Sequence, residues 1–213
     1  MNTEDLIALL ASDAEAVDWR ASTRRFVVAL AAGSVAAATV SIGLLGPRPN
    51  LLEQTSIPMF WAREAFCAAL GAAGLVAVHR LARPGRALGW LPAALATPFA
   101  AMWLLAAVTL VEADPHDRAG LIFGHTAAVC PALIAMVSAP LFAAFVWVMK
   151  GLAPTRLRLA GAACGLAAGA IGALAYTLHC PELAAPFLGV WYVLGMLIPT
   201  AIGAWAGPTL LRW

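Results

Sequence analysis

Charged side chains are scarce in this chain. They make up 11% of its 213 residues, whereas 62% of the residues are hydrophobic. A composition this apolar, with a mean hydropathy of +0.86, lies outside the range of ordinary soluble domains. It excludes a conventional water-soluble core and indicates a protein built for the lipid bilayer.

The sequence signatures of common enzymes are lacking as well. The chain has no P-loop, HExxH or GxSxG pattern, so we expect no enzymatic activity and no required cofactor. The formal net charge of +2 is too small to indicate direct binding of nucleic acid. None of the four cysteines forms a CxxC pair, which excludes zinc-finger spacing.

What the chain does have is six long apolar stretches, each ended by Pro, Gly or charge. A helix needs about 20 residues to cross a hydrocarbon layer of about 30 Å. The fourth stretch is too long to lie straight, and we expect Pro131 and Pro140 to kink or break it. The predicted spans are residues 26–45, 57–79, 87–111, 119–149, 159–178 and 186–206.

These spans predict an all-α fold, a polytopic membrane protein with a six-transmembrane-helix bundle and a short cytoplasmic N-terminal amphipathic helix. Residues 1–25 form the cytoplasmic N-terminal segment and residues 26–213 the transmembrane domain. With the N-terminus in the cytoplasm, ten of the 13 basic residues fall on the cytoplasmic side. The three on the outer side are Arg48, Arg63 and Arg118. This positive-inside bias places both termini in the cytoplasm.

Two ionisable residues interrupt the second apolar stretch, Arg63 and Glu64. Ionisable groups within a span usually mark a functional pathway. Neighbouring residues on a helix point in different directions, however. We therefore expect the two side chains to anchor the helix at the interface and not to form a direct ion pair.

The first 18 residues predict a helix that stands free of the membrane. Asn2 or Thr3 can cap it, and acidic residues follow in its first turn. One face is apolar and the other acidic; the residues that we expect to bind a partner are Leu6, Ile7, Leu10, Asp13 and Val17. A helix this short is marginal alone. A lipid surface is the alternative partner, but its helices usually carry Lys and Arg, so a protein partner is favoured.

Small residues recur at every fourth position of the fifth span, at Gly161, Gly165 and Gly169. Such spacing lets helices approach closely. It predicts tight packing within the bundle, and a homodimer face is the alternative.

Two cysteines stand out by their predicted position. Cys180 lies in an outer loop that reads HCPE, and Cys130 lies in the fourth span towards the same side. Thiolate is a soft metal ligand and imidazole a borderline one. Cys130, Cys180 and His179 could therefore bind a thiophilic metal ion, with His125 or His116 as further ligands, or the two thiols could form a disulfide. The alternative for Cys130, and more strongly for Cys67 and Cys164, is a small buried apolar side chain.

The C-terminal part of the chain carries a family resemblance. Residues 179–196 read HCPELAAPFLGVWYVLGM, followed by Pro199, Gly203, Gly207-Pro208 and a closing Leu211-Arg212-Trp213. This block resembles the NrsF family of bacterial anti-sigma factors. The resemblance implies a six-helix inner-membrane protein that sequesters an extracytoplasmic-function sigma factor through its N-terminal segment. It also links two cysteines, by position Cys130 and Cys180, to sensing heavy-metal stress, whereas Cys67 and Cys164 should be dispensable.

The hypothesis is then a membrane anti-sigma factor that releases its sigma factor when Cys130 and Cys180 meet a soft metal or an oxidant. The metal would be the signal and not a cofactor. A small transporter or channel for a metal or oxidant is the main alternative, and a membrane thiol oxidoreductase is a second one. The acidic amphipathic tail argues against the transporter.

Overall fold

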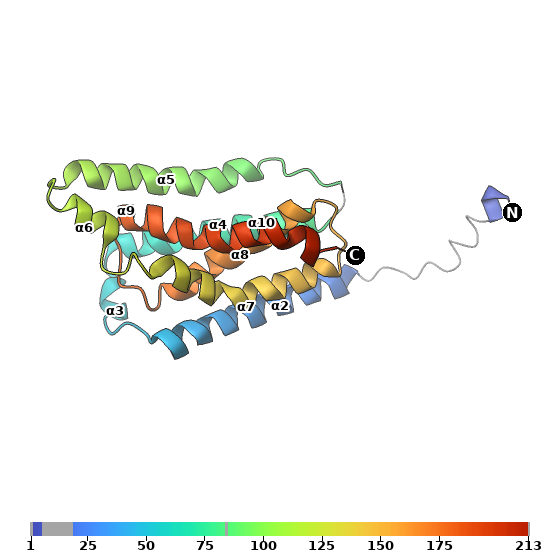
Figure 1. Ribbon diagram of the computed structural model, residues 1–213, viewed down its shortest axis with the longest axis horizontal. Helices are drawn as coiled ribbons and strands as arrows, with labels where there is room; N and C mark the ends of the chain where they lie inside the picture. Colours follow the sequence, from blue (N-terminus) through green and yellow to red (C-terminus); the bar gives the residue numbers. More distant parts are fainter. Residues whose placement is uncertain (1, 6–18, 84, 213) are drawn as a thin grey trace.

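The computed structural model describes residues 2–5, 19–83 and 85–212, and all regular structure within them is helical (Figure 1). Six segments are long and apolar enough to cross a membrane, as the sequence predicts: Thr23–Leu45, Pro58–Leu81, Leu91–Glu112, Cys130–Lys150, Leu157–Tyr176 and Ala185–Leu210. The long helices are α2 (Trp19–Val40), α4 (Pro58–Leu81), α5 (Leu91–Glu112), α7 (Cys130–Lys150), α8 (Leu157–Tyr176) and α10 (Val193–Leu210). Two π-helical turns, η1 (Ser41–Leu45) and η2 (Leu188–Tyr192), extend α2 and precede α10.

The fourth predicted span, 119–149, is broken, but not at either of the two prolines. It divides into α6 (Arg118–Phe123) and α7, and the break falls at Gly124, which has φ of +50°. Neither proline breaks the chain: Pro131 occupies the first turn of α7, and Pro140 lies inside that helix. A proline in the first turn is tolerated because no intrahelical N–H is lost there. Cys130 is therefore the first residue of α7.

Helix α8 occupies the centre of the bundle and contacts α10, α4, α7 and α2. Its small residues make this possible. A Cβ added at Gly161 would meet the backbone of Gly203 on α10, and one added at Gly172 would lie 2.8 Å from the Cα of Ser138 on α7. The small-residue stripe thus serves close packing within one chain, as predicted. The homodimer face stays a prediction.

The bundle has two ends with different contents (Figure 1). At the terminal end, α2 begins and α10 ends. At the opposite end, which we call the cysteine end, lie α3 (Leu51–Gln54), α6 and α9 (Ala185–Phe187), together with the segment that carries Cys180.

The start of the predicted tail helix is visible. Thr3–Asp5 are helical, and the backbone N–H of Asn2 donates to the Asp5 carboxylate at 3.3 Å, as in a helix N-terminal capping arrangement. The residues predicted to bind a partner (Leu6, Ile7, Leu10, Asp13 and Val17) lie outside the described residues, and that prediction stays a prediction.

Candidate functional site

The structure brings Cys130 and Cys180 together at the cysteine end, although 50 positions separate them in sequence. Cys130 is the first residue of α7. After α8 ends, the backbone N–H of Cys180 donates to the carbonyl of Tyr176 at 3.0 Å, so the chain curls back and turns the thiol inward. Both thiols are fully buried and free, and their side chains lie within hydrogen-bonding reach of each other.

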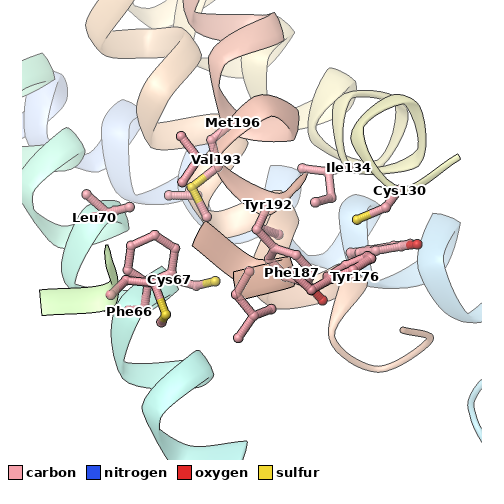
Figure 2. Packing of buried hydrophobic residues seen from close by; sticks show 14 of the residues in the cluster. Phe66, Cys67, Leu70, Cys130, Ile134, Tyr176, Phe187, Tyr192, Val193 and Met196 are labelled. Carbon is pink, nitrogen blue, oxygen red and sulfur yellow. The ribbon is translucent and has the colours of Figure 1, made fainter. Parts of the chain in front are cut away.

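Two tyrosines form the inner wall of this thiol pair. Tyr176, the last residue of α8, and Tyr192, the last of η2, are both fully buried with ring centroids 6.0 Å apart. Figure 2 shows them grouped with Phe187 and Cys130. Neither hydroxyl has a partner of ordinary hydrogen-bond geometry; their polar neighbours are the two thiols, at longer range. The sulfur atoms therefore sit in an enclosed, largely apolar chamber.

The buried guanidinium of Arg63 supports the Cys180 segment. The Arg63 side chain on α4 has no exposed surface, and its Nη1 donates to the carbonyls of Cys180 (3.2 Å) and Glu182 (3.1 Å). Its Nη2 lies 3.1 Å from Glu64 Oε1. The expectation that these neighbours would not pair is wrong, because Arg63 is long enough to reach Glu64 while its other nitrogen faces the loop. Arg63 is also no interfacial anchor, since protein encloses it.

A second buried arginine, Arg48, reaches the same carbonyl. It lies between η1 and α3, is 7% exposed, and donates from Nη1 to Cys180 O at 2.8 Å. Both guanidinium groups lie over the Phe60 ring, Arg48 at 5.7 Å and Arg63 at 5.4 Å from its centroid. Burial, and then the charge of Arg63, lowers the pKa of Arg48. Two cations thus hold one carbonyl, that of the residue carrying the thiol.

Glu182 closes the other side of the segment. Its carboxylate accepts a hydrogen bond from the backbone N–H of His125 at 2.7 Å. A Cβ at Gly124 would lie 2.7 Å from that carboxylate, and Gly124 also needs its positive φ. This position therefore accepts only glycine without rearrangement. The break before α7 and the Cys180 segment are consequently fitted to each other.

These neighbours make the two thiols unequal. The pKa of Cys180 is lowered, first by the hydrogen bond that Cys130 donates; burial opposes this. Tyr192, the backbone N–H of Glu182 and the charge of Arg63 act in the same direction as Cys130. Cys180 is therefore the thiol that ionises first, and thiolate is the reactive form.

The predicted histidine ligand does not join the thiols. His179 Nδ1 lies 2.9 Å from the carbonyl of Gly46. Among the described residues, no group of three or more His, Cys, Asp or Glu side chains is arranged to hold a metal ion. The set of Cys130, Cys180 and His179 is thus not assembled here, and metal binding by the cysteines stays a prediction.

The remaining cysteines lie elsewhere in the core. Cys67 on α4 belongs to the same apolar cluster as the thiol pair, whereas Cys164 lies in a separate cluster nearer the terminal end. Both are buried and free. Arg48, Tyr176 and Tyr192 belong to the site although the sequence pattern of the cysteines does not indicate them. For Arg48 a signal existed, because it is one of three arginines on the wrong side of the positive-inside distribution.

Comparisons with known proteins agree with one another. A family model described as NrsF, negative regulator of sigma F, matches residues 10–213. A probable anti-sigma-F factor from Azospira oryzae is 51% identical over 213 residues, and an anti-sigma-F factor from Caulobacter vibrioides is 39% identical over 216 residues. Both alignments cover the whole of each chain. No solved structure matches.

Proposed function

Because the chain belongs to the NrsF family of negative regulators of sigma F, we propose that it is an anti-sigma factor of the bacterial inner membrane with a thiol sensor. It holds an extracytoplasmic-function sigma factor through its N-terminal segment and releases it when Cys130 and Cys180 react. The family is regulatory and not enzymatic, and the six apolar helices make the chain a membrane protein. The proposal that the cysteines sense the signal is supported by one observation: Cys130 and Cys180 lie close together in one buried site.

Charge supports an orientation in which the cysteine end faces out of the cytoplasm. Ten of the 13 basic residues lie in the tail or at the terminal end. Cytoplasmic segments retain Lys and Arg, so this end is the cytoplasmic one. The N-terminal segment then meets a cytoplasmic sigma factor, while the thiols lie near the compartment from which metals and oxidants arrive.

A soft cation fits two thiols without a third ligand, since two thiolates satisfy a linear soft metal. The lowered pKa of Cys180 makes it a thiolate at neutral pH, so a divalent cation displaces only the proton of Cys130. The charge of the site then rises by one, from that of a single thiolate to that of a neutral metal dithiolate.

An oxidant that accepts two electrons provides the second route. The Cys180 thiolate and the Cys130 thiol together give up two electrons to the oxidant, the one thiol proton leaves Cys130, and an S–S bond forms between the two sulfur atoms. Metal binding and disulfide formation both change the distance between the sulfur atoms of Cys130, at the start of α7, and Cys180, and then hold that distance fixed. Either one is a structural change at the cysteine end.

On the cytoplasmic side, the tail is suited to hold a protein by an amphipathic helix. Leu6, Ile7, Leu10 and Val17 would enter an apolar groove of the sigma factor. Asp13 would face a basic surface used for DNA or polymerase. A coupling free energy of about 1–3 kcal/mol between the thiols and the tail changes the affinity by about 5- to 150-fold.

The test is a co-purification of the detergent-solubilised chain with the sigma factor encoded beside it, alongside a version lacking residues 1–18. Capture by the full chain and loss of capture by the truncated one is the expected result. Equal capture by both would remove the tail from the mechanism. Capture by neither, with metal transport retained by the truncated chain, would favour the transporter over the regulator.

A further inference from the structure

Helix α2 and the η1 turn form one uninterrupted rod between the two ends of the bundle (Figure 1). The rod begins at Trp19, next in sequence to the N-terminal segment, and ends at Leu45 at the cysteine end. A hydrogen-bonded helix resists compression and bending along its length. A displacement of one end therefore reaches the other.

Hydrogen bonds fasten the cysteine end of this rod to the chain that leads into Cys180. Ser41 Oγ donates to the carbonyl of Ala175 at 2.8 Å. The backbone N–H of Arg48 donates to the carbonyl of Leu178 at 3.0 Å, and its Nη1 donates to that of Cys180 at 2.8 Å. The contact between His179 Nδ1 and Gly46 O, at 2.9 Å, adds a fourth connection. Residues 41–48 thus follow any movement of residues 175–180.

The flank of the rod is attached to the helix of the other cysteine. Gly33 of α2 sits directly against Leu141 of α7, and the rings of Phe26 and Phe145 stack with centroids 5.8 Å apart. Cys130 is the first residue of α7. Helix α2 is therefore joined to both thiols, to Cys180 at its tip and to Cys130 along its side.

The rest of the α2 surface leaves it free to shift. Its large apolar side chains Val27, Val28, Val35, Ile42 and Leu44 are exposed in the structure, where they would face lipid. By contrast, α8 is enclosed by other helices. The η1 turn has π-helical geometry, an irregularity often found at functional sites. A small slide or rotation of α2 thus disturbs mainly its contacts with α7, α8 and the Cys180 segment.

We propose that α2 transmits the state of the Cys130–Cys180 pair to the N-terminal segment, and that Ser41 and Arg48 are the positioning residues that hold α2 in the sigma-binding state. This coupling rests on the proposed function. A new separation between the two sulfur atoms moves the Cys180 segment relative to α7. Because α2 is attached to both, it changes its position, and the tail that continues from it loses its grip.

The first test compares two double variants of the full chain in lipid nanodiscs, with Hg²⁺ as the thiophilic probe. Ser41→Ala with Arg48→Gln removes the two side-chain hydrogen bonds that Ser41 and Arg48 donate to the Cys180 segment and leaves the His179 contact in place. Thr39→Ala with Arg118→Gln is the matched control: Thr39 bonds only within α2, to Val35 O, and Arg118 only to nearby Ala113 O. Sigma-factor affinity is measured before and after Hg²⁺, and alkylation protection reports whether the thiols have bound it.

We expect the connection variant to bind the sigma factor about 5- to 150-fold more weakly without Hg²⁺ and to change less than about twofold on adding it. The control should match the unmodified chain in both states. Unchanged affinity and a full response to Hg²⁺ in the connection variant would overturn the proposal.

A second variant avoids any disturbance of the bundle. A flexible insertion of six Gly and Ser residues between Asp18 and Trp19 leaves the sequences of the tail and of the helices unchanged and places a flexible spacer between them. It should hold the sigma factor as tightly as the unmodified chain and keep holding it after Hg²⁺ protects the thiols. Release equal to that of the unmodified chain would overturn the role of α2. If the unmodified chain itself fails to bind or to release, the proposed function fails, and the coupling falls with it.

Discussion

Arg63 and Cys180 are 117 positions apart, yet the guanidinium of the first donates a hydrogen bond to the backbone carbonyl of the second at 3.2 Å. A buried cation within a membrane span persists only where its donors find acceptors. Arg63 finds them in two loop carbonyls and in Glu64. Helix α4 therefore holds the segment that carries the reactive thiol.

Replacing Arg63 by Met should destabilise the protein strongly. The change removes the ion-pair partner of Glu64, the side-chain donor to the Glu182 carbonyl and one of the two arginine donors to the Cys180 carbonyl. Breaking a buried ion pair in this way costs about 3–5 kcal/mol. Thermal unfolding in detergent, followed by intrinsic tryptophan fluorescence, measures the effect. Arg118→Met is the control, because Arg118 is exposed and its loss should cost less than about 0.5 kcal/mol. Equal melting of the two variants would show that Arg63 does not support the fold.

The two cysteine pairs should separate by function. Cys130→Ser with Cys180→Ser should abolish release of the sigma factor by metal or oxidant, while Cys67→Ser with Cys164→Ser should leave it intact. All four side chains are buried and change by the same atom, so packing costs are matched. A sigma-dependent reporter in cells gives the readout. Undiminished induction in the first variant would end the sensing assignment.

The contact between α8 and α10 depends on the absence of side chains. Gly161→Ala should lower the free energy of unfolding by about 1–3 kcal/mol, because the new methyl group meets the backbone of Gly203 and overpacks the interface. Gly43→Ala should be neutral, since no atom lies within 4 Å of its Cβ position. Chemical unfolding in mixed micelles compares the two. A similar loss in both variants would contradict the packing explanation, because helix propensity by itself favours Ala over Gly.

Cys180 should react with an unusual dependence on pH. Its pKa is lowered, first through the hydrogen bond from Cys130, so its thiolate already predominates at neutral pH. In the Cys67→Ser/Cys164→Ser background, modification by methyl methanethiosulfonate should rise less than about twofold between pH 7 and pH 9. An ordinary thiol gains roughly twentyfold in thiolate over that range. Tyr192→Phe removes a hydroxyl that helps to lower the pKa of Cys180 and should steepen the profile. A twentyfold rise at Cys180 in the parent would contradict the assigned hydrogen bonds.

The six spans could be predicted from sequence because the bilayer demands long apolar helices, and their ends differ from the prediction by a few residues. The place where the fourth apolar stretch breaks could not be predicted. Prolines drew attention to residues 131 and 140, but the chain breaks at Gly124, where the carboxylate of Glu182 approaches the backbone. That contact joins positions far apart in sequence, and local patterns do not contain it.

The site, too, could be predicted only in part from the sequence. The chemistry of thiols and the predicted position near the outer side of the membrane indicated Cys130 and Cys180, which the structure brings together. The supporting residues were hidden because their partners are main-chain atoms. Arg48 and Arg63 looked like exceptions in a charge distribution, and the structure shows each of them donating to the carbonyl of Cys180.

Those two arginines grip the oxygen of a peptide bond, which every amino acid at position 180 would supply. Replacing the Cys180 side chain therefore leaves both hydrogen bonds from the arginines to the backbone carbonyl in place. The side chain at position 180 sets the reactivity, whereas the backbone contacts set the position of the segment. Relatives of this chain are thus free to evolve a different reactive group at that position without a change in the membrane bundle.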